Sequence, residues 1–168
     1  MKRKVKAANE GVLDTPSLPL PTFGTGEVAR ILGVEIWRIQ SYLDSPKYQI
    51  SPTGQQLGTG RGSRRVFTDE DVYRLGIAEH LVRDGFSYKF VSKALQQIDD
   101  EDLLGPFDSE GRELDLVYAL VGGEENLQVH GISRNKTIAD LAKRFKSPSL
   151  YLLDITKIVI EIQKRMKG

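Results

Sequence analysis

The sequence contains no cysteine among its 168 residues, and this absence removes whole classes of chemistry. Without a thiol, the chain cannot form a disulfide, bind zinc through thiolates or sense oxidants with a cysteine. Its two histidines, His80 and His130, lie on different predicted elements and lack the spacing of metal ligands. No Ser-His-Asp arrangement or pair of carboxylates indicates a catalytic cleft. We therefore predict that the protein is not an enzyme and has no metal or cofactor.

Long apolar runs are missing as well. No segment approaches the roughly 20 apolar residues of a membrane-spanning helix, and the basic start Lys2–Lys4 is not followed by the apolar stretch of a signal peptide. We therefore expect a cytoplasmic, nucleoid-associated protein that does not bind membranes. Residues 1–22 contain three prolines and little periodicity, which predicts a flexible arm. Its basic residues either touch phosphates or are simply solvated.

An excess of either charge is also absent, since 24 Lys and Arg balance 23 Asp and Glu. The whole chain thus lacks the basic character of many nucleic-acid binders. The charges are nevertheless unevenly distributed. Residues 35–65 hold five basic and two acidic side chains, a net +3, whereas Asp99–Asp102 is an acidic run. A nucleic-acid interface is therefore expected in the 35–65 segment.

Two short helices are predicted between residues 25 and 43. The first begins after Thr25, whose hydroxyl can cap free backbone amides, and Gly33 supplies the left-handed residue that ends it. The second runs from Glu35 to Leu43. At 100° per residue, its inward face is expected to consist of Ile36, Ile39 and Leu43.

The opposite side of this second helix is the predicted recognition surface, from which Trp37, Arg38 and Ser41 project. The major groove of DNA admits such a helix. Because a guanidinium can read guanine or clamp phosphate, Arg38 is the leading candidate for a specific contact. Trp37 either reaches a thymine methyl group or a sugar, or packs as core under the following hairpin.

The segment Gln49–Thr68 is rich in glycine and predicts a β-hairpin with strands near Tyr48–Ser51 and Arg64–Phe67. Glycines at its tip would allow close approach to a nucleic-acid backbone or minor groove. Arg61, Arg64 and Arg65 would then supply charge toward phosphates. The alternative, a nucleotide-binding phosphate loop, lacks the Gly-Lys-Ser/Thr ending and a directly following helix.

Two further helices follow the hairpin. Thr68 and Asp71 have the spacing of a capping box at the start of the first, and Asp84 and Gly85 close it. Ser87 then caps the second, and Lys89 in its first turn can reach a phosphate. This order, two helices with a glycine turn, a basic hairpin and two more helices, is the sequence form of a winged helix-turn-helix.

Three stretches in the right order resemble the DNA-binding domain of the MerR family of transcription regulators. They are GEVARILGV at Gly26–Val34, RRVFTDEDV at Arg64–Val72 and DGFS at Asp84–Ser87. The resemblance implies a dimer on a palindromic operator, with the second helix in the major groove, the wing on the backbone, and DNA distortion coupled to an effector. It also matches Arg65 to the wing arginine of the family and Tyr42 to the tyrosine that ends the recognition helix.

The chain departs from the family pattern in its recognition helix, its wing and its C-terminal third. Trp37 and Gln40 stand where the family commonly has arginines, and the wing is longer. The C-terminal third lacks the long antiparallel coiled coil by which typical members dimerise. Its pattern instead predicts strands at Leu114–Val121 and Leu127–Ile132, a helix at Thr137–Phe145, a strand at Leu150–Leu153 and a final helix capped by Asp154.

The sequence thus predicts an α+β protein, a winged helix-turn-helix followed by a small ββαβα module. The expected division is an arm at 1–22, the DNA-binding domain at 23–100, an acidic linker at 101–112 and the module at 113–168. The apolar stripe of the final helix is expected to cover the module's sheet, which is compatible with self-association through the same module. The module binds an unknown small-molecule or protein effector or dimerises the chain. The predicted DNA-binding residues are Glu35, Trp37, Arg38, Ser41, Tyr42, Arg61, Arg64, Arg65 and Lys89.

The function predicted from these features is a sequence-specific transcription regulator that binds double-stranded DNA as a homodimer. One alternative is an architectural protein, of the excisionase or chromosome-anchoring kind, that bends or bridges DNA. A further alternative is an adaptor whose helix-turn-helix fold binds protein, but such a protein would have no need of phosphate-binding arginines.

Overall fold

A computed structural model of the chain describes residues 22–44, 56–57, 64–98, 103, 116–133, 138–147 and 149–168. The arm predicted at residues 1–22 lies outside the described residues, apart from Thr22 at its end. The predicted strand Tyr48–Ser51 and most of the linker predicted at 101–112 lie outside them as well.

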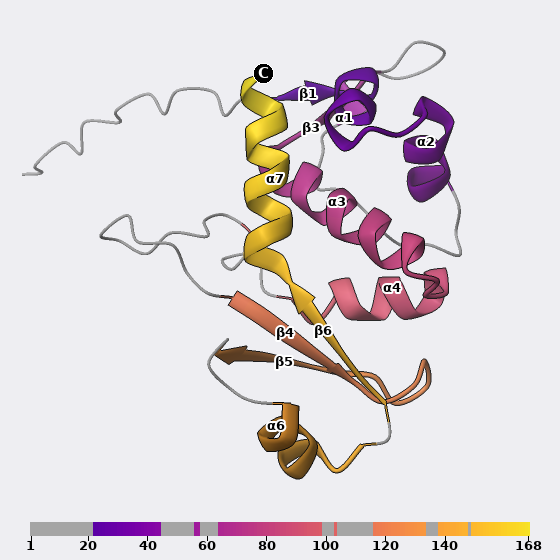
Figure 1. The fold of residues 1–168 in the computed structure, drawn as a ribbon. Helices are drawn as coiled ribbons and strands as arrows, with labels where there is room; N and C mark the ends of the chain where they lie inside the picture. Colours follow the sequence, from indigo (N-terminus) through magenta and orange to yellow (C-terminus); the bar gives the residue numbers. More distant parts are fainter. Residues whose placement is uncertain are drawn as a thin grey trace, which may run out of the picture.

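The N-terminal part is built from helices around a small antiparallel sheet (Figure 1). Its strands lie in the order β1-β3-β2, with Phe23 opposite Phe67 and Gln56 opposite Arg65. The predicted strand Arg64–Phe67 and the two helices that follow it are confirmed. The elements are β1 Phe23–Gly24, α1 Thr25–Leu32, α2 Ile36–Asp44, β2 Gln56–Leu57, β3 Arg64–Phe67, α3 Asp69–Arg83 and α4 Tyr88–Leu95.

Local capping explains where most of these helices begin and end. The Thr68 hydroxyl accepts from the amide of Asp71, whose carboxylate accepts from the amide of Thr68, so the predicted capping box is confirmed. Ser87 caps α4 by accepting from the amide of Phe90, also as predicted. The prediction for Thr25 is wrong. Helix α1 begins at Thr25 itself, Gly24 holds the N-cap position, and no side chain caps the helix there.

The C-terminal part is a three-stranded antiparallel sheet with two helices, and the predicted ββαβα order is confirmed. Its strand order is β5-β4-β6. Gly122 has φ +95° in the turn after β4, where an added Cβ would lie 2.8 Å from the carbonyl oxygen of Asn126. The elements are β4 Leu116–Val121, β5 Gln128–Ser133, α6 Ile138–Phe145, β6 Leu150–Asp154 and α7 Ile155–Lys167.

Strand β4 carries apolar side chains on both faces, and other elements cover each face. Tyr118 and Leu120 belong to the main core cluster, together with Leu153 of β6. The alternating residues Val117, Ala119 and Val121 form a second cluster with Leu141 of α6. Side chains along a strand point alternately to opposite faces. The sheet is therefore a middle layer, with α6 on one side and the main core on the other.

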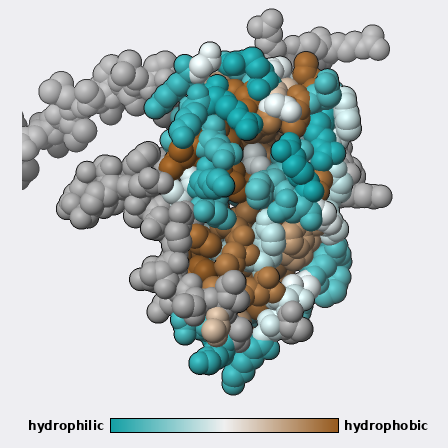
Figure 2. Space-filling view, viewed as in Figure 1, coloured by the Kyte–Doolittle hydropathy of each residue, from teal (hydrophilic) through white to brown (hydrophobic). Residues whose placement is uncertain are grey.

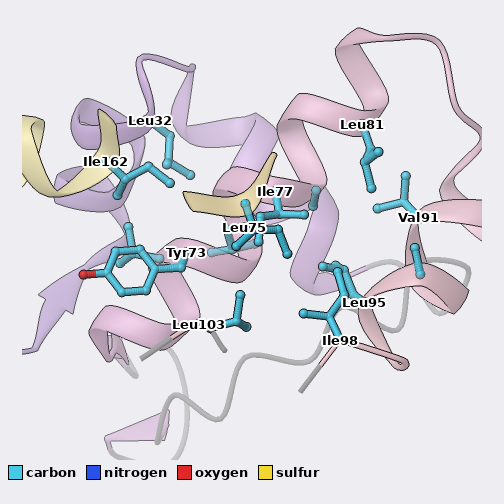
Figure 3. Packing of buried hydrophobic residues seen from close by; sticks show 14 of the residues in the cluster. Leu32, Tyr73, Leu75, Ile77, Leu81, Val91, Leu95, Ile98, Leu103 and Ile162 are labelled. Carbon is cyan, nitrogen blue, oxygen red and sulfur yellow. The ribbon is translucent and has the colours of Figure 1, made fainter. Parts of the chain in front are cut away.

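Helix α7 joins the two parts of the molecule. It contacts α3 and α1 as well as β4, and Ile162 lies beside Leu32 in the core (Figure 3). Leu103, within the predicted acidic linker, is helical and completely buried in the same cluster. Figure 2 shows hydrophobic residues gathered just below the middle of this face, with hydrophilic residues above them and at the lower end. The described residues of the N-terminal part and of the C-terminal part therefore share one main core.

Candidate nucleic-acid interface

A glycine turn sets α2 against α1. Gly33 has φ +68°, a left-handed conformation that favours glycine, and its amide donates to the carbonyls of Ala29 and Arg30. The amide of Val34 donates to the Ala29 carbonyl at 2.9 Å. These bonds satisfy carbonyls at the end of α1 and redirect the chain into α2. The predicted role of Gly33 is confirmed.

Burial shows which way α2 faces. Ile39 and Tyr42 are buried, whereas Ile36 is 50% exposed and Trp37 is 62% exposed. The prediction that Ile36 lies on the inward face is wrong, because Tyr42 occupies the inward position one turn after Ile39. The exposure of Trp37 also contradicts the alternative in which this side chain packs as core. The helix is rotated so that its start presents two large apolar side chains to solvent.

Arg38 does not project from the outer face, and that prediction is wrong. Its Nε donates to Oε2 of Glu79 on α3 at 3.0 Å, and the Tyr42 hydroxyl donates to the same oxygen at 2.6 Å. The side chains of Arg38 and Glu79 are 25% and 12% exposed. The hydrogen bond to Glu79 raises the pKa of the Arg38 guanidinium. The pair ties α2 to α3.

Tyr42 is 1% exposed and lies in the core. Burial is the main cause that raises the pKa of its hydroxyl, and the hydrogen bond to Glu79 adds to it. Its ring centroid lies 5.9 Å from that of Tyr88 on α4. The structure therefore places this predicted DNA-binding residue between α2, α3 and α4, where it positions the recognition helix.

The remaining predicted residues of this region lie near the start and outer side of α2. Ser41 is partly exposed and its hydroxyl donates to the Arg38 carbonyl at 2.7 Å. Glu35 is exposed just before the helix. Glu35, Trp37 and Arg38 help to line an open hollow of about 430 Å³ beside the glycine turn. Gln40 is exposed on α2, although the sequence prediction did not include it among the DNA-binding residues.

The arginines of the hairpin are described in part. Strand β3 carries Arg64 opposite Leu57 and Arg65 opposite Gln56, and Arg65 is partly exposed. Arg61 and the side chain of Arg64 lie outside the described residues. The structure thus supports the hairpin that would present these cations.

Lys89 lies against an acidic turn of the C-terminal sheet. Its Nζ donates to Oε1 of Glu125 at 2.5 Å and lies 3.3 Å from Oε1 of Glu124. Glu124 also accepts from the Ser87 hydroxyl, a bond that lowers the pKa of its carboxyl group. Lys93 donates to the Glu124 backbone carbonyl at 2.7 Å. Lys89 is thus paired with carboxylates far away in sequence.

The two histidines lie apart from this surface. His80 lies 3.8 Å from the Asp84 carboxylate, which also accepts from the Tyr151 hydroxyl. The His130 ring stacks on Phe145, with centroids 4.7 Å apart. Among the residues that the structure describes, no group of three or more His, Cys, Asp or Glu side chains is placed to hold a metal ion. No helix in the described ranges is both long and apolar enough to cross a membrane.

Of the comparisons with known proteins, one finds a family match and another finds none. A comparison with curated proteins finds no match. Residues 23–98 match the family described as MerR HTH family regulatory protein, over the range in which the sequence motifs occur. This family consists of non-enzymatic, DNA-binding regulators. Residues 23–98 therefore form a MerR-type helix-turn-helix DNA-binding domain.

Proposed function

We propose that the protein is a sequence-specific transcription regulator that binds duplex DNA as a homodimer. Helix α2 lies in the major groove, and the β2–β3 hairpin lies along the backbone. The observation that carries this proposal is the exposed side of α2 within a MerR-type domain that also contains an arginine-bearing strand.

Each predicted contact takes a role in this proposal. The outer side of α2, with Glu35, Trp37 and Ser41 on or beside it, faces the bases, while Arg61, Arg64 and Arg65 bind phosphate. Arg38 and Tyr42 hold α2 in place through Glu79. Lys89 reaches phosphate only when its pairs with Glu124 and Glu125 open.

The C-terminal module, residues 113–168, is proposed to dimerise the chain or bind an effector, while residues 23–100 form the DNA-binding domain. Helix α7 gives the module a route to the DNA-binding domain. Nη1 of Arg165 donates to the carbonyls of Ile31 and Leu32 at 3.5 and 3.4 Å, at the end of α1. A shift of α7 would therefore move the helix that supports α2.

Selection of binding sites from random duplexes with the full-length protein tests the proposal, followed by footprinting of the selected site. We expect a saturable footprint over an inverted repeat and a steep loss of affinity with salt, about 0.9 in log–log slope per phosphate neutralised. Arg65→Ala should weaken binding and reduce that slope. Lys157→Ala, which removes an exposed cation at the start of α7, should leave both unchanged.

Equal affinity for selected and random DNA would overturn sequence-specific binding. Cooperative spreading along DNA of any sequence would favour the architectural alternative. A protein of monomer mass in solution and on the selected site would contradict the dimer.

A further inference from the structure

We propose that α2 selects A·T base pairs, with Trp37 and Ile36 contacting thymine methyl groups and Gln40 reading adenine. This inference rests on the proposed function and names the base pairs that the recognition helix prefers. It follows from how α2 is rotated, from what restrains Arg38, and from the chemistry of the side chains that remain outside.

The rotation of α2 leaves three side chains available at its outer side. Ile36 and Trp37 are 50% and 62% exposed, and Gln40 is also exposed. Ile39 and Tyr42 are buried on the opposite side. Since successive residues are about 100° apart, Trp37 and Gln40 lie about 60° apart on the helix surface. They can therefore enter one groove together.

Arg38 is the side chain on α2 best suited to guanine, and it is held elsewhere. Its Nε is bonded to Glu79 at 3.0 Å, on the side of α2 that faces α3. A guanine contact through Nε would break this charge-assisted hydrogen bond and leave a largely buried carboxylate without that partner. The bond therefore holds the guanidinium toward α3 and limits the ways in which Arg38 can reach a guanine.

The exposed side chains match what an A·T pair presents. Thymine carries the methyl group of the major groove, and large apolar side chains gain by covering it. Glutamine can bond to N6 and N7 of adenine at once. Residues three apart on a helix are about 4.5 Å apart along its axis, at about 1.5 Å per residue. That distance is larger than the rise of about 3.4 Å between stacked base pairs, so Trp37 and Gln40 can reach different, neighbouring A·T pairs.

Base analogues in the selected site provide the test. Replacing one thymine by uracil removes only the methyl group, and we expect wild-type affinity to fall about fourfold, the value of one buried methyl group. At the thymine that Trp37 covers, Trp37→Ala should bind the thymine and uracil sites equally. Replacing adenine by 7-deazaadenine removes N7 and should weaken the wild type roughly tenfold, with no such effect in Gln40→Ala.

The outcomes separate this inference from the proposed function. Saturable binding to selected sites that are G·C-rich under α2, or unchanged affinity for uracil sites at every thymine, would overturn A·T selection while leaving DNA regulation in place. Persistence of the uracil effect in Trp37→Ala would overturn the role of Trp37. Failure to bind any duplex would overturn the proposed function itself. Thermal unfolding checks that Trp37→Ala stays folded, and Lys157→Ala is the matched surface control.

Discussion

Two of the contacts that join the DNA-binding domain to the C-terminal part are opposite in character. Helix α7 meets α3 through a close apolar fit, in which an added Cβ at Gly76 would lie 2.3 Å from Cδ1 of Ile162. At the other contact, Lys89 on α4 pairs with exposed Glu124 and Glu125. The first depends on shape and excludes water. The second depends on charge and stays in solvent.

This difference separates the contact that fixes the fold from the contact that responds to its surroundings. Buried apolar packing is not weakened by the screening of charges, whereas exposed ion pairs contribute little to stability and are screened by salt. A polyanion such as DNA can therefore compete for Lys89 without disturbing α7. Variants at each contact test this division, from the largest expected effect to the smallest.

Ile162→Ala should weaken the apolar contact most strongly, by about 3 kcal/mol in the free energy of unfolding, since it leaves a cavity beside Gly76. Urea denaturation measures the loss. Gly76→Ala added to Ile162→Ala should restore about 1 kcal/mol, because the methyl group enters vacated space and alanine favours a helix. A double variant less stable than Ile162→Ala alone would contradict the proposed fit.

For the contact between α2 and α3, we expect a loss of stability between those at the apolar contact and at the ion pairs. Glu79→Ala should cost about 2 kcal/mol, because it removes the acceptor of the Tyr42 hydroxyl and the Arg38 guanidinium. Tyr42→Phe should cost less in the Glu79→Ala background than in the wild type, since the hydroxyl has already lost Glu79 as an acceptor. If the losses from Tyr42→Phe and Glu79→Ala add up in the double variant, the two side chains act independently.

The acidic turn should affect DNA binding more than stability. Glu124→Gln with Glu125→Gln removes both carboxylates that face Lys89. The thermal midpoint should barely change, because ion pairs at the surface contribute little to stability. Affinity for the selected site should rise, and its log–log salt slope should steepen by about 0.9 if Lys89 gains one phosphate. Glu161→Gln, an exposed change on α7, is the control. Unchanged affinity and slope would show that Lys89 takes no part in DNA binding.

Local patterns predict much of the fold. The capping residues Thr68 and Ser87 act on amides three residues away, so their effects can be read from neighbouring sequence. The apolar stripe of α7 is likewise visible in the sequence. The sequence does not show which surfaces that stripe covers, because periodicity gives the direction of a helix face and not the identity of its partner.

What the sequence does not reveal at the candidate site has the same origin. The pattern of α2 assigns Arg38 to its outer side, but Glu79, on α3, draws this side chain inward. The phosphate contact of Lys89 stays a prediction, and the sequence gives no sign that Glu124 and Glu125 pair with this lysine from a turn in the C-terminal sheet. Each partner is distant in sequence and belongs to another element. The DNA-binding roles of the predicted residues remain predictions that the binding experiments test.

The fit of Ile162 against Gly76 also has a consequence for synthesis. The ribosome makes the chain from its N-terminus, and N-terminal domains generally begin to fold first. Leu32 and Gly76 emerge well before Ile162, the residue that packs against them. Until then, the new helix-turn-helix has an uncovered apolar surface. The DNA-binding domain therefore reaches its final packing only after α7 has been made.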